Sequence, residues 1–128
     1  SLPTEYRCEL VHDTAVNTTI IMFCAYFRAK FVIEEKQRVL DVCDALNAGD
    51  YETVGKKMYE THAGLSKDYE VSCEELDFLN DVAKTLGVTG SRIMGGGFGG
   101  CTINLVKNDL HDTSSTRCFS SITNFARK

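Results

Sequence analysis

Five of the six residues from 95 to 100 are glycines, and the sixth is Phe98. Fixing a glycine backbone costs more conformational entropy than fixing any other residue, so such a run destabilises the fold and needs a structural or functional reason. A turn that only joins two strands needs no more than two residues such as Asn-Gly. Short β-branched stretches flank the run at 88–94 and 101–106. The pattern predicts a strand, a glycine-rich loop and a second strand.

Consecutive glycine amides can approach a ligand closely and can form a concave nest of N–H donors that suits phosphate oxygens. An anionic ligand is therefore the natural candidate, and a tight bend for close strand–helix packing is the alternative. Gly95, Gly97 and Gly100 have G-x-G-x-x-G spacing, but a dinucleotide site needs a helix to open at the last glycine, where a strand is expected here. No V-A-I-K, H-R-D or D-F-G occurs, which excludes a protein-kinase loop.

The residues around the loop make its context specific. Residues 91–101, SRIMGGGFGGC, resemble the third signature of the GHMP kinases. Upstream, DYEVSC at 68–73, ELD at 75–77 and GSR at 90–92 are similar to the galactokinase branch of that superfamily. The resemblance extends over residues 28–106.

The resemblance implies an α+β fold, the ferredoxin-like GHMP kinase carboxy-terminal domain, in which helices cover an antiparallel sheet. We expect a single domain over residues 1–128, with 1–27 and 107–128 as edges that match the family pattern poorly. A chain of 128 residues is long enough to bury a core without metals or disulfides as staples.

In galactokinases the amino-terminal lobe holds the galactose contacts, a second phosphate loop, the catalytic base and the magnesium ligands, and none of those motifs occurs in this sequence. The resemblance therefore implies a fragment of an ATP-dependent sugar kinase, with ATP, Mg²⁺ and galactose as ligands of the intact enzyme and the amino-terminal lobe as partner. It implies no catalytic or metal-ligating residue here and no cofactor bound to this chain alone. The phosphate-proximal loop would be Gly95, Gly96, Gly97, Phe98, Gly99 and Gly100, with Ser91 and Arg92 as candidate supporting residues.

A non-catalytic relative is the competing hypothesis. A galactokinase-like module could use the loop to bind a ligand and signal its presence to a partner without chemistry. Binding separates the two hypotheses, because a sensor should bind ATP or galactose by itself whereas a severed kinase lobe should bind neither.

Charge and hydropathy argue against other classes. A net charge of -4 does not favour the broad positive surface that nucleic acid requires. The longest apolar run, 20–27, is far short of the roughly 20 residues that span a bilayer, and residues 1–10 show no secretory pattern. Six scattered cysteines without a C-x-x-C pair favour free thiols in a reducing cytoplasm, with disulfides or a metal as alternatives.

Apolar residues at helical spacing predict a helix over 28–47. Gly49 supplies a stop, and Asp50 is placed to cap a second helix that runs to Leu65. Residues 1–27 are the hardest part to interpret, and their β-branched and aromatic residues suggest a strand or two.

A third helix is predicted from a capping box at Ser72 to Glu75, in which the Ser72 hydroxyl would accept from the Glu75 amide. Gly87 would end this helix in a left-handed backbone conformation. A final helix packing on the sheet is predicted beyond residue 112 from the spacing of three apolar residues, Phe119, Ile122 and Phe125.

Several side chains have a functional and an ordinary interpretation, and we favour the ordinary one. Arg92 is expected to be solvated or ion-paired, Phe98 to anchor the loop by burying its ring, and Cys101 to be a buried, inert thiol. His62 is expected to be a hydrogen-bonded, partly buried histidine. Capping and solvated charges, rather than a metal cluster, are expected at Asp68, Glu70, Glu74, Glu75 and Asp77.

Overall fold

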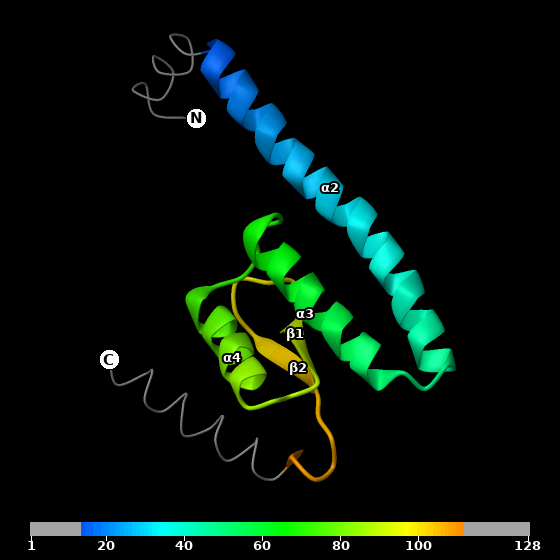
Figure 1. Ribbon diagram of the computed structural model, residues 1–128. Coiled ribbons are helices and arrows are strands. Elements are labelled where there is room, and N and C mark those ends of the chain that lie inside the picture. Colours follow the sequence, from blue (N-terminus) through cyan, green and yellow to red (C-terminus); the bar gives the residue numbers. More distant parts are fainter. Residues whose placement is uncertain (1–13, 112–128) are drawn as a thin grey trace.

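The computed structural model describes residues 14–111 (Figure 1). Two antiparallel helices are followed by a shorter helix and a two-stranded antiparallel sheet. Helix α3 contacts both α2 and β1, while α4 packs on both strands. The expected α+β class, with helices on an antiparallel sheet, is confirmed, and the final helix predicted beyond residue 112 lies outside the described residues. The elements are α2 (Thr14–Asn47), α3 (Tyr51–Lys67), α4 (Glu74–Thr85), β1 (Gly90–Met94) and β2 (Cys101–Leu105).

Helix α2 is much longer than the helix predicted over 28–47, since it begins at Thr14. The strands suggested before residue 28 are therefore wrong from residue 14 onward. No glycine or proline interrupts the sequence between Thr14 and Asn47. Once a helix has nucleated, each further residue adds one hydrogen bond, so helix extends through β-branched residues when no breaker stops it and no strand partner competes.

The α2–α3 connection follows the sequence signals. Gly49 has a φ of 72°, the left-handed conformation that glycine adopts cheaply, and the Asp50 amide donates to the Ala45 carbonyl at 2.8 Å. The Asp50 carboxylate accepts from the Thr53 amide at 3.1 Å. The predicted stop and the predicted N-cap are both confirmed.

The start of α4 differs from the predicted capping box. Cys73 is the N-cap residue, and its side chain makes no capping hydrogen bond. The Ser72 hydroxyl instead donates to Asp77 Oδ1 at 2.7 Å. A carboxylate is a stronger acceptor than a neutral group, so the hydroxyl acts as a donor to it. The predicted end of the helix is confirmed, because Gly87 has a φ of 77°.

Two glycines let α3 lie directly on the start of β1, a contact that we call the α3–β1 seam. A Cβ atom added at Gly55 would lie 1.9 Å from the Thr89 carbonyl oxygen, and one at Gly90 would lie 2.5 Å from the Gly55 Cα. The antiparallel register runs from Gly90 opposite Leu105 to Met94 opposite Cys101. The buried apolar side chains of the described residues are Phe31, Ala45, Val54, Leu76, Ala83, Val88 and Ile93.

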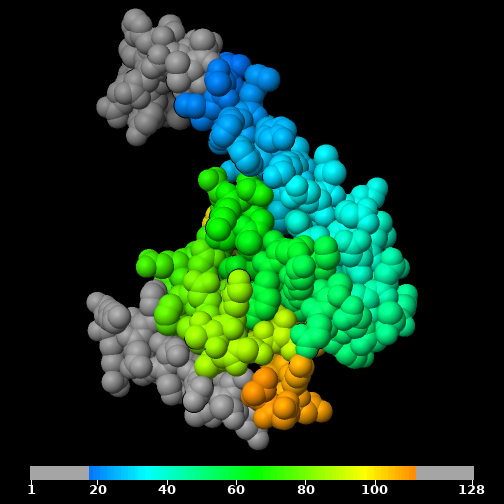
Figure 2. All heavy atoms as spheres, in the orientation of Figure 1, coloured from blue at the N-terminus to red at the C-terminus, as the bar shows by residue number. Residues whose placement is uncertain are grey.

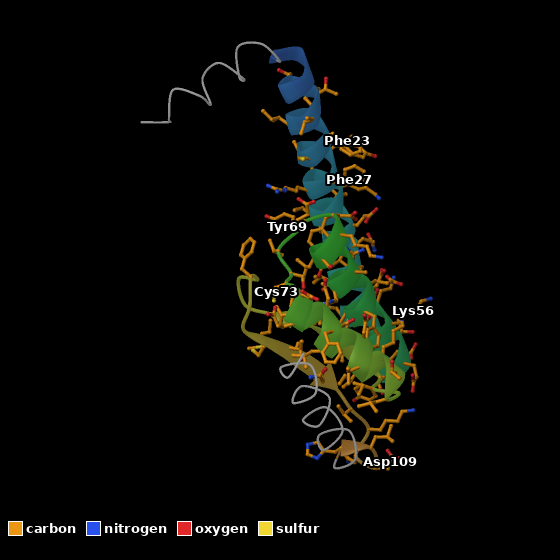
Figure 3. The ribbon with its side chains drawn as sticks, turned by 90° about the vertical axis from the view of Figure 1, so that its left-hand side faces the viewer. Phe23, Phe27, Lys56, Tyr69, Cys73 and Asp109 are labelled. Carbon is orange, nitrogen blue, oxygen red and sulfur yellow. The ribbon has the colours of Figure 1, made fainter. Side chains whose placement is uncertain are left out.

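The amino-terminal part of α2 projects from the rest of the described chain (Figure 2). Figure 3 shows Phe23 and Phe27 on α2 beyond Tyr69, which follows α3. The ring centroids of Phe23 and Phe27 are 4.7 Å apart. No described helix is long and apolar enough to cross a membrane. The large apolar side chains exposed on α2 are Ile20, Ile21, Met22, Phe23, Tyr26, Val32, Ile33, Val39, Leu40 and Leu46.

Candidate functional site

The glycine-rich loop, residues 95–100, joins the paired ends of β1 and β2. The predicted order of strand, loop and strand is therefore confirmed. Most of its backbone is in a region that residues with a side chain rarely adopt. Its residues are exposed or half-buried. The backbone conformation therefore favours glycine at positions 95, 97, 99 and 100. The positive φ values are 93° at Gly95, 85° at Gly97, 57° at Phe98, 134° at Gly99 and 101° at Gly100.

Space around the loop shows that most of its glycines are not packing residues. A Cβ atom added at Gly95, Gly96 or Gly99 would meet nothing within 4 Å. A tight bend made for close packing would leave no such space, so the packing interpretation fails at these three positions. The open amides can accept a ligand that approaches the backbone closely.

The middle of the loop rests on the α3–α4 connection. The Phe98 amide donates to the Val71 carbonyl at 2.7 Å, and a Cβ at Gly97 would lie 2.3 Å from the same oxygen. Val71 was part of the phrase that carried the family resemblance, but nothing in the sequence marked its carbonyl as the support of the loop. Only the tertiary structure brings these segments together.

Two of the expected burial states are wrong. The Phe98 side chain is 76% exposed, and Cys101 is also exposed. Phe98 has a positive φ and uses its amide, rather than its ring, to attach the loop. Cys101 occupies the first position of β2, beside the loop, where no helix covers its side chain. The other described cysteines, Cys24, Cys43 and Cys73, are free as expected.

The two candidate supporting residues lie in different surroundings. Ser91 is completely buried, and its carbonyl accepts from Asn80 Nδ2 at 2.8 Å. Arg92 Nη1 lies 3.8 Å from Glu35 Oε1, and its Nε donates to the Ile93 carbonyl at 3.1 Å. Arg92 is therefore ion-paired, as expected, and a supporting role for either residue stays a prediction.

Asp77 is a hydrogen-bond centre rather than a solvated charge. Its Oδ1 accepts from Ser72 at 2.7 Å and lies 2.9 Å from His62 Nε2, and its Oδ2 accepts from Ser66 Oγ at 2.8 Å. Burial would raise the pKa of Asp77, but the hydrogen bonds together outweigh it and lower the pKa below its ordinary value. His62 is hydrogen-bonded through Nε2, as expected, but it is more deeply buried than expected and its buried Nδ1 has no hydrogen-bond partner among the described residues. Among the described residues, no group of three or more His, Cys, Asp or Glu side chains could hold a metal ion.

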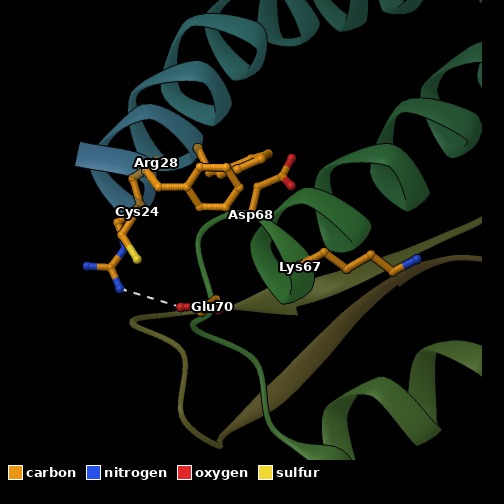
Figure 4. A pocket seen from close by; sticks show the side chains of 7 residues that line it. Cys24, Arg28, Lys67, Asp68 and Glu70 are labelled. Carbon is orange, nitrogen blue, oxygen red and sulfur yellow. Dashed lines mark ion pairs between the residues drawn. The ribbon is translucent and has the colours of Figure 1, made fainter. Parts of the chain in front are cut away.

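A hollow of about 300 Å³ lies between α2 and the end of α3 (Figure 4). Arg28 Nη2 and Glu70 Oε2 form an ion pair of 3.7 Å at its edge. Phe23, Cys24 and Phe27 supply its apolar side. The hollow contains no residue of the glycine-rich loop, and its lining is a mixture of aromatic carbon and opposite charges without convergent polar groups.

Residues 43–113 match the family model described as GHMP kinases C terminal. The chain belongs to the GHMP kinases. Among curated relatives of this GHMP kinase domain, galactokinase of Bos taurus is 50% identical over 84 residues, 65% of this chain and 21% of the relative. Galactokinase of Roseiflexus is 47% identical over 87 residues, 67% of this chain and 22% of the relative. The domain thus spans about a fifth of the length of these relatives.

Solved structures agree with this assignment. Galactokinase of Lactococcus lactis, solved in complex with galactose, superimposes with a TM-score of 0.73 at 33% identity, covering 80% of this chain and 26% of that one. Mevalonate kinase of L. major, solved with R-mevalonate, superimposes with a TM-score of 0.69 at 21% identity, covering 94% and 35%. The second likeness concerns the fold alone.

Proposed function

We propose that this chain is the carboxy-terminal lobe of a galactokinase, the enzyme that transfers the γ-phosphate of ATP to galactose, and that the glycine-rich loop borders the nucleotide phosphates. The observation that carries the proposal is the loop itself: five glycines whose backbone is held open, with unfilled space beside Gly95, Gly96 and Gly99. The similarity to galactokinases supplies the reaction and the sugar.

The loop suits a phosphate group, and we propose that the magnesium ion is held elsewhere in the intact enzyme. Backbone amides in consecutive glycines supply N–H donors without a side chain in the way. Mg²⁺ prefers carboxylate and phosphate oxygens, and the described residues contain no group of three or more His, Cys, Asp or Glu side chains that could hold a metal ion. When bound, ATP supplies the phosphoryl group and Mg²⁺ neutralises its charge, and we assign the metal ligands to the other lobe.

Phosphoryl transfer depends on positioning and on stabilising negative charge around the transferred group. Amides of the glycine-rich loop contribute to both, because they fix phosphate oxygens and offset their charge. They supply no base to remove a proton from the sugar. The isolated chain is therefore expected to be inactive and to need its amino-terminal lobe.

Exposed apolar side chains near the loop support the need for a partner. Met94 is exposed immediately before the loop, Phe98 is exposed within it, and Ile103 is exposed on β2. Such residues beside a binding loop are typical of a surface that another unit covers. The amino-terminal lobe of the same kinase is the partner that we propose for this surface.

Reconstitution tests the proposal. The chain is mixed with the amino-terminal lobe of a galactokinase, and galactose-dependent ADP release is measured with and without each piece. Turnover only when both pieces are present supports the proposal, and failure to associate at high concentration contradicts it. Calorimetry on the chain alone tests the sensing alternative, which requires binding of ATP or galactose without the second lobe.

A matched pair of variants connects this activity to the loop. Gly96→Ala places a methyl group in the open space beside the amides, whereas Lys56→Ala changes an exposed position on α3. We expect the first to lower turnover of the reconstituted enzyme and the second to leave it unchanged. Equal activity of both variants would contradict a role of the loop in the reaction.

A further inference from the structure

The glycine-rich loop has little stiffness of its own, so its position depends on what holds it. Its middle is held at one point, where the Phe98 amide donates to the Val71 carbonyl at 2.7 Å. Gly97 packs against the same carbonyl, since a Cβ there would approach it to 2.3 Å. The placement of Val71 therefore decides where the open amides of the loop lie.

Val71 is fixed from both sides. Its own amide donates to the Leu65 carbonyl at 3.0 Å, which ties it to α3. On the other side, the Ser72 hydroxyl donates to Asp77 Oδ1 at 2.7 Å, which ties it to α4. Glu70 before it has a φ of 58°, so the backbone turns sharply at this point.

Asp77 joins the two helices that flank this connection. Besides Ser72, its carboxylate contacts His62 Nε2 at 2.9 Å and Ser66 Oγ at 2.8 Å, both on α3. Hydrogen bonds to an ionised carboxylate are stronger than those between neutral groups. One side chain on α4 thus fixes the end of α3 and the segment that carries the loop.

We infer that Asp77, acting through Ser72 and Val71, is a positioning residue for the glycine-rich loop. Its hydrogen bonds go to His62, Ser66 and Ser72, and its proposed role needs no contact with a ligand. Its effect reaches the loop through the Ser72 hydroxyl, the Val71 carbonyl and the Phe98 amide. The claim that these amides bind a nucleotide rests on the proposed function. The claim that Asp77 positions the loop does not depend on it.

Amide hydrogen exchange in the full chain, without nucleotide, tests the inference. In Ser72→Ala the Phe98 amide is expected to exchange about tenfold faster, the change that corresponds to losing the net free energy of one hydrogen bond. Ser72→Thr keeps a hydroxyl and should restore slow exchange. Asp77→Ala should act in the same direction as Ser72→Ala, and Ser72→Ala keeps the test valid if Asp77→Ala does not fold.

A matched control separates positioning from general loosening. Asp41 is a half-buried carboxylate on α2 that accepts from Gln37 and pairs with Lys57 of α3, so Asp41→Asn disturbs a similar cluster away from the Val71 segment. It should leave Phe98 exchange unchanged. Unchanged Phe98 exchange in Ser72→Ala, or an equal acceleration of the β1 amides, would overturn the inference.

Kinetic measurements on the same variants in the reconstituted enzyme distinguish the positioning role of Asp77 from the proposed kinase function. A displaced loop should raise the KM for ATP severalfold more than it lowers kcat, and Ser72→Thr should reverse the change. If the unaltered chain gives no turnover with its second lobe, the proposed function fails. The exchange experiment still decides the positioning role in that case.

Discussion

Glycines in two regions of this domain serve opposite purposes. At the α3–β1 seam, Gly55 and Gly90 have no room for a side chain, and the nearest atom in the way at each position belongs to the backbone. In the loop, Gly95 and Gly99 have ample room, but their φ values of 93° and 134° exclude most side chains. The seam needs glycine for space, and the loop needs it for backbone conformation.

This contrast distinguishes glycines that maintain the fold, which we call the framework, from glycines of the candidate binding loop. A residue surrounded by filled space contributes to stability, because any added atom must displace a neighbour. A residue with a left-handed backbone beside open space carries an entropic cost that packing does not repay. Gly97 belongs to both groups, since it has a φ of 85° and also contacts Val71. It is the point where the loop meets the framework.

The largest effect is expected from Gly55→Ala. Overpacking against backbone costs about 3 kcal/mol, and the higher helix propensity of alanine returns about 1 kcal/mol, so the free energy of unfolding should fall by about 2 kcal/mol. Denaturant unfolding measures this. Gly64→Ala is the control in the same helix, because its Cβ meets the Phe31 ring, which can move, and the loss should be smaller.

Gly97→Ala should have the next largest effect and act mainly on the loop. The left-handed backbone costs about 1 kcal/mol, and contact with the Val71 carbonyl should push the loop outward. Faster exchange of the Phe98 amide is the expected result. Gly95→Ala has the same backbone strain without the contact, so slow Phe98 exchange should persist there. Equal acceleration in both variants would show that strain alone moves the loop.

Low pH should weaken the hydrogen bonds of Asp77, which support the loop, and should not change the packing of the α3–β1 seam. The pKa of Asp77 is lowered from 3.8, so its carboxylate contributes stability that is fully present above that value and lost as pH falls through the lower, folded-state pKa. Partial exposure of the side chain keeps this effect small. The difference in unfolding free energy between the unaltered chain and Asp77→Asn should shrink over this range, whereas the difference for Gly55→Ala should not.

The smallest effect on stability is expected from Gly96→Ala. A Cβ there meets nothing within 4 Å, and the φ of Gly96 lies outside the left-handed range. The free energy of unfolding should change by less than about 0.5 kcal/mol, as at ordinary surface positions. A marked loss of stability, measured by the same denaturant unfolding, would mean that the loop is part of the framework and would remove the contrast between the two regions.

Parts of this fold could be predicted because their signals are local. Asp50 caps α3 by accepting a hydrogen bond from Thr53, only three positions away. Gly49 and Gly87 end helices because each adopts a left-handed backbone conformation. The strands and the open loop follow from neighbouring residues too. Gly55 carried a weaker signal, because a glycine inside a helix costs about 1 kcal/mol relative to alanine and so indicates close packing.

Other features depended on distant partners. Ser72 looked like a helix cap, but a carboxylate five positions on attracted its hydroxyl. Phe98 looked like an anchor, but its amide found the Val71 carbonyl and its ring stayed exposed. The amino-terminal part of α2 looked like strand, because its composition resembles that of a strand.

The sequence by itself determined where the backbone must be glycine, where helices end, and which superfamily the chain resembles, because those properties depend on residues close together in the chain. Tertiary structure alone decided that Val71 supports the loop, that Asp77 joins α3 to α4, and that α3 lies against β1 at two glycines. Hydrogen bonds and steric contacts act over only a few ångströms, so they exist only after folding brings distant segments together.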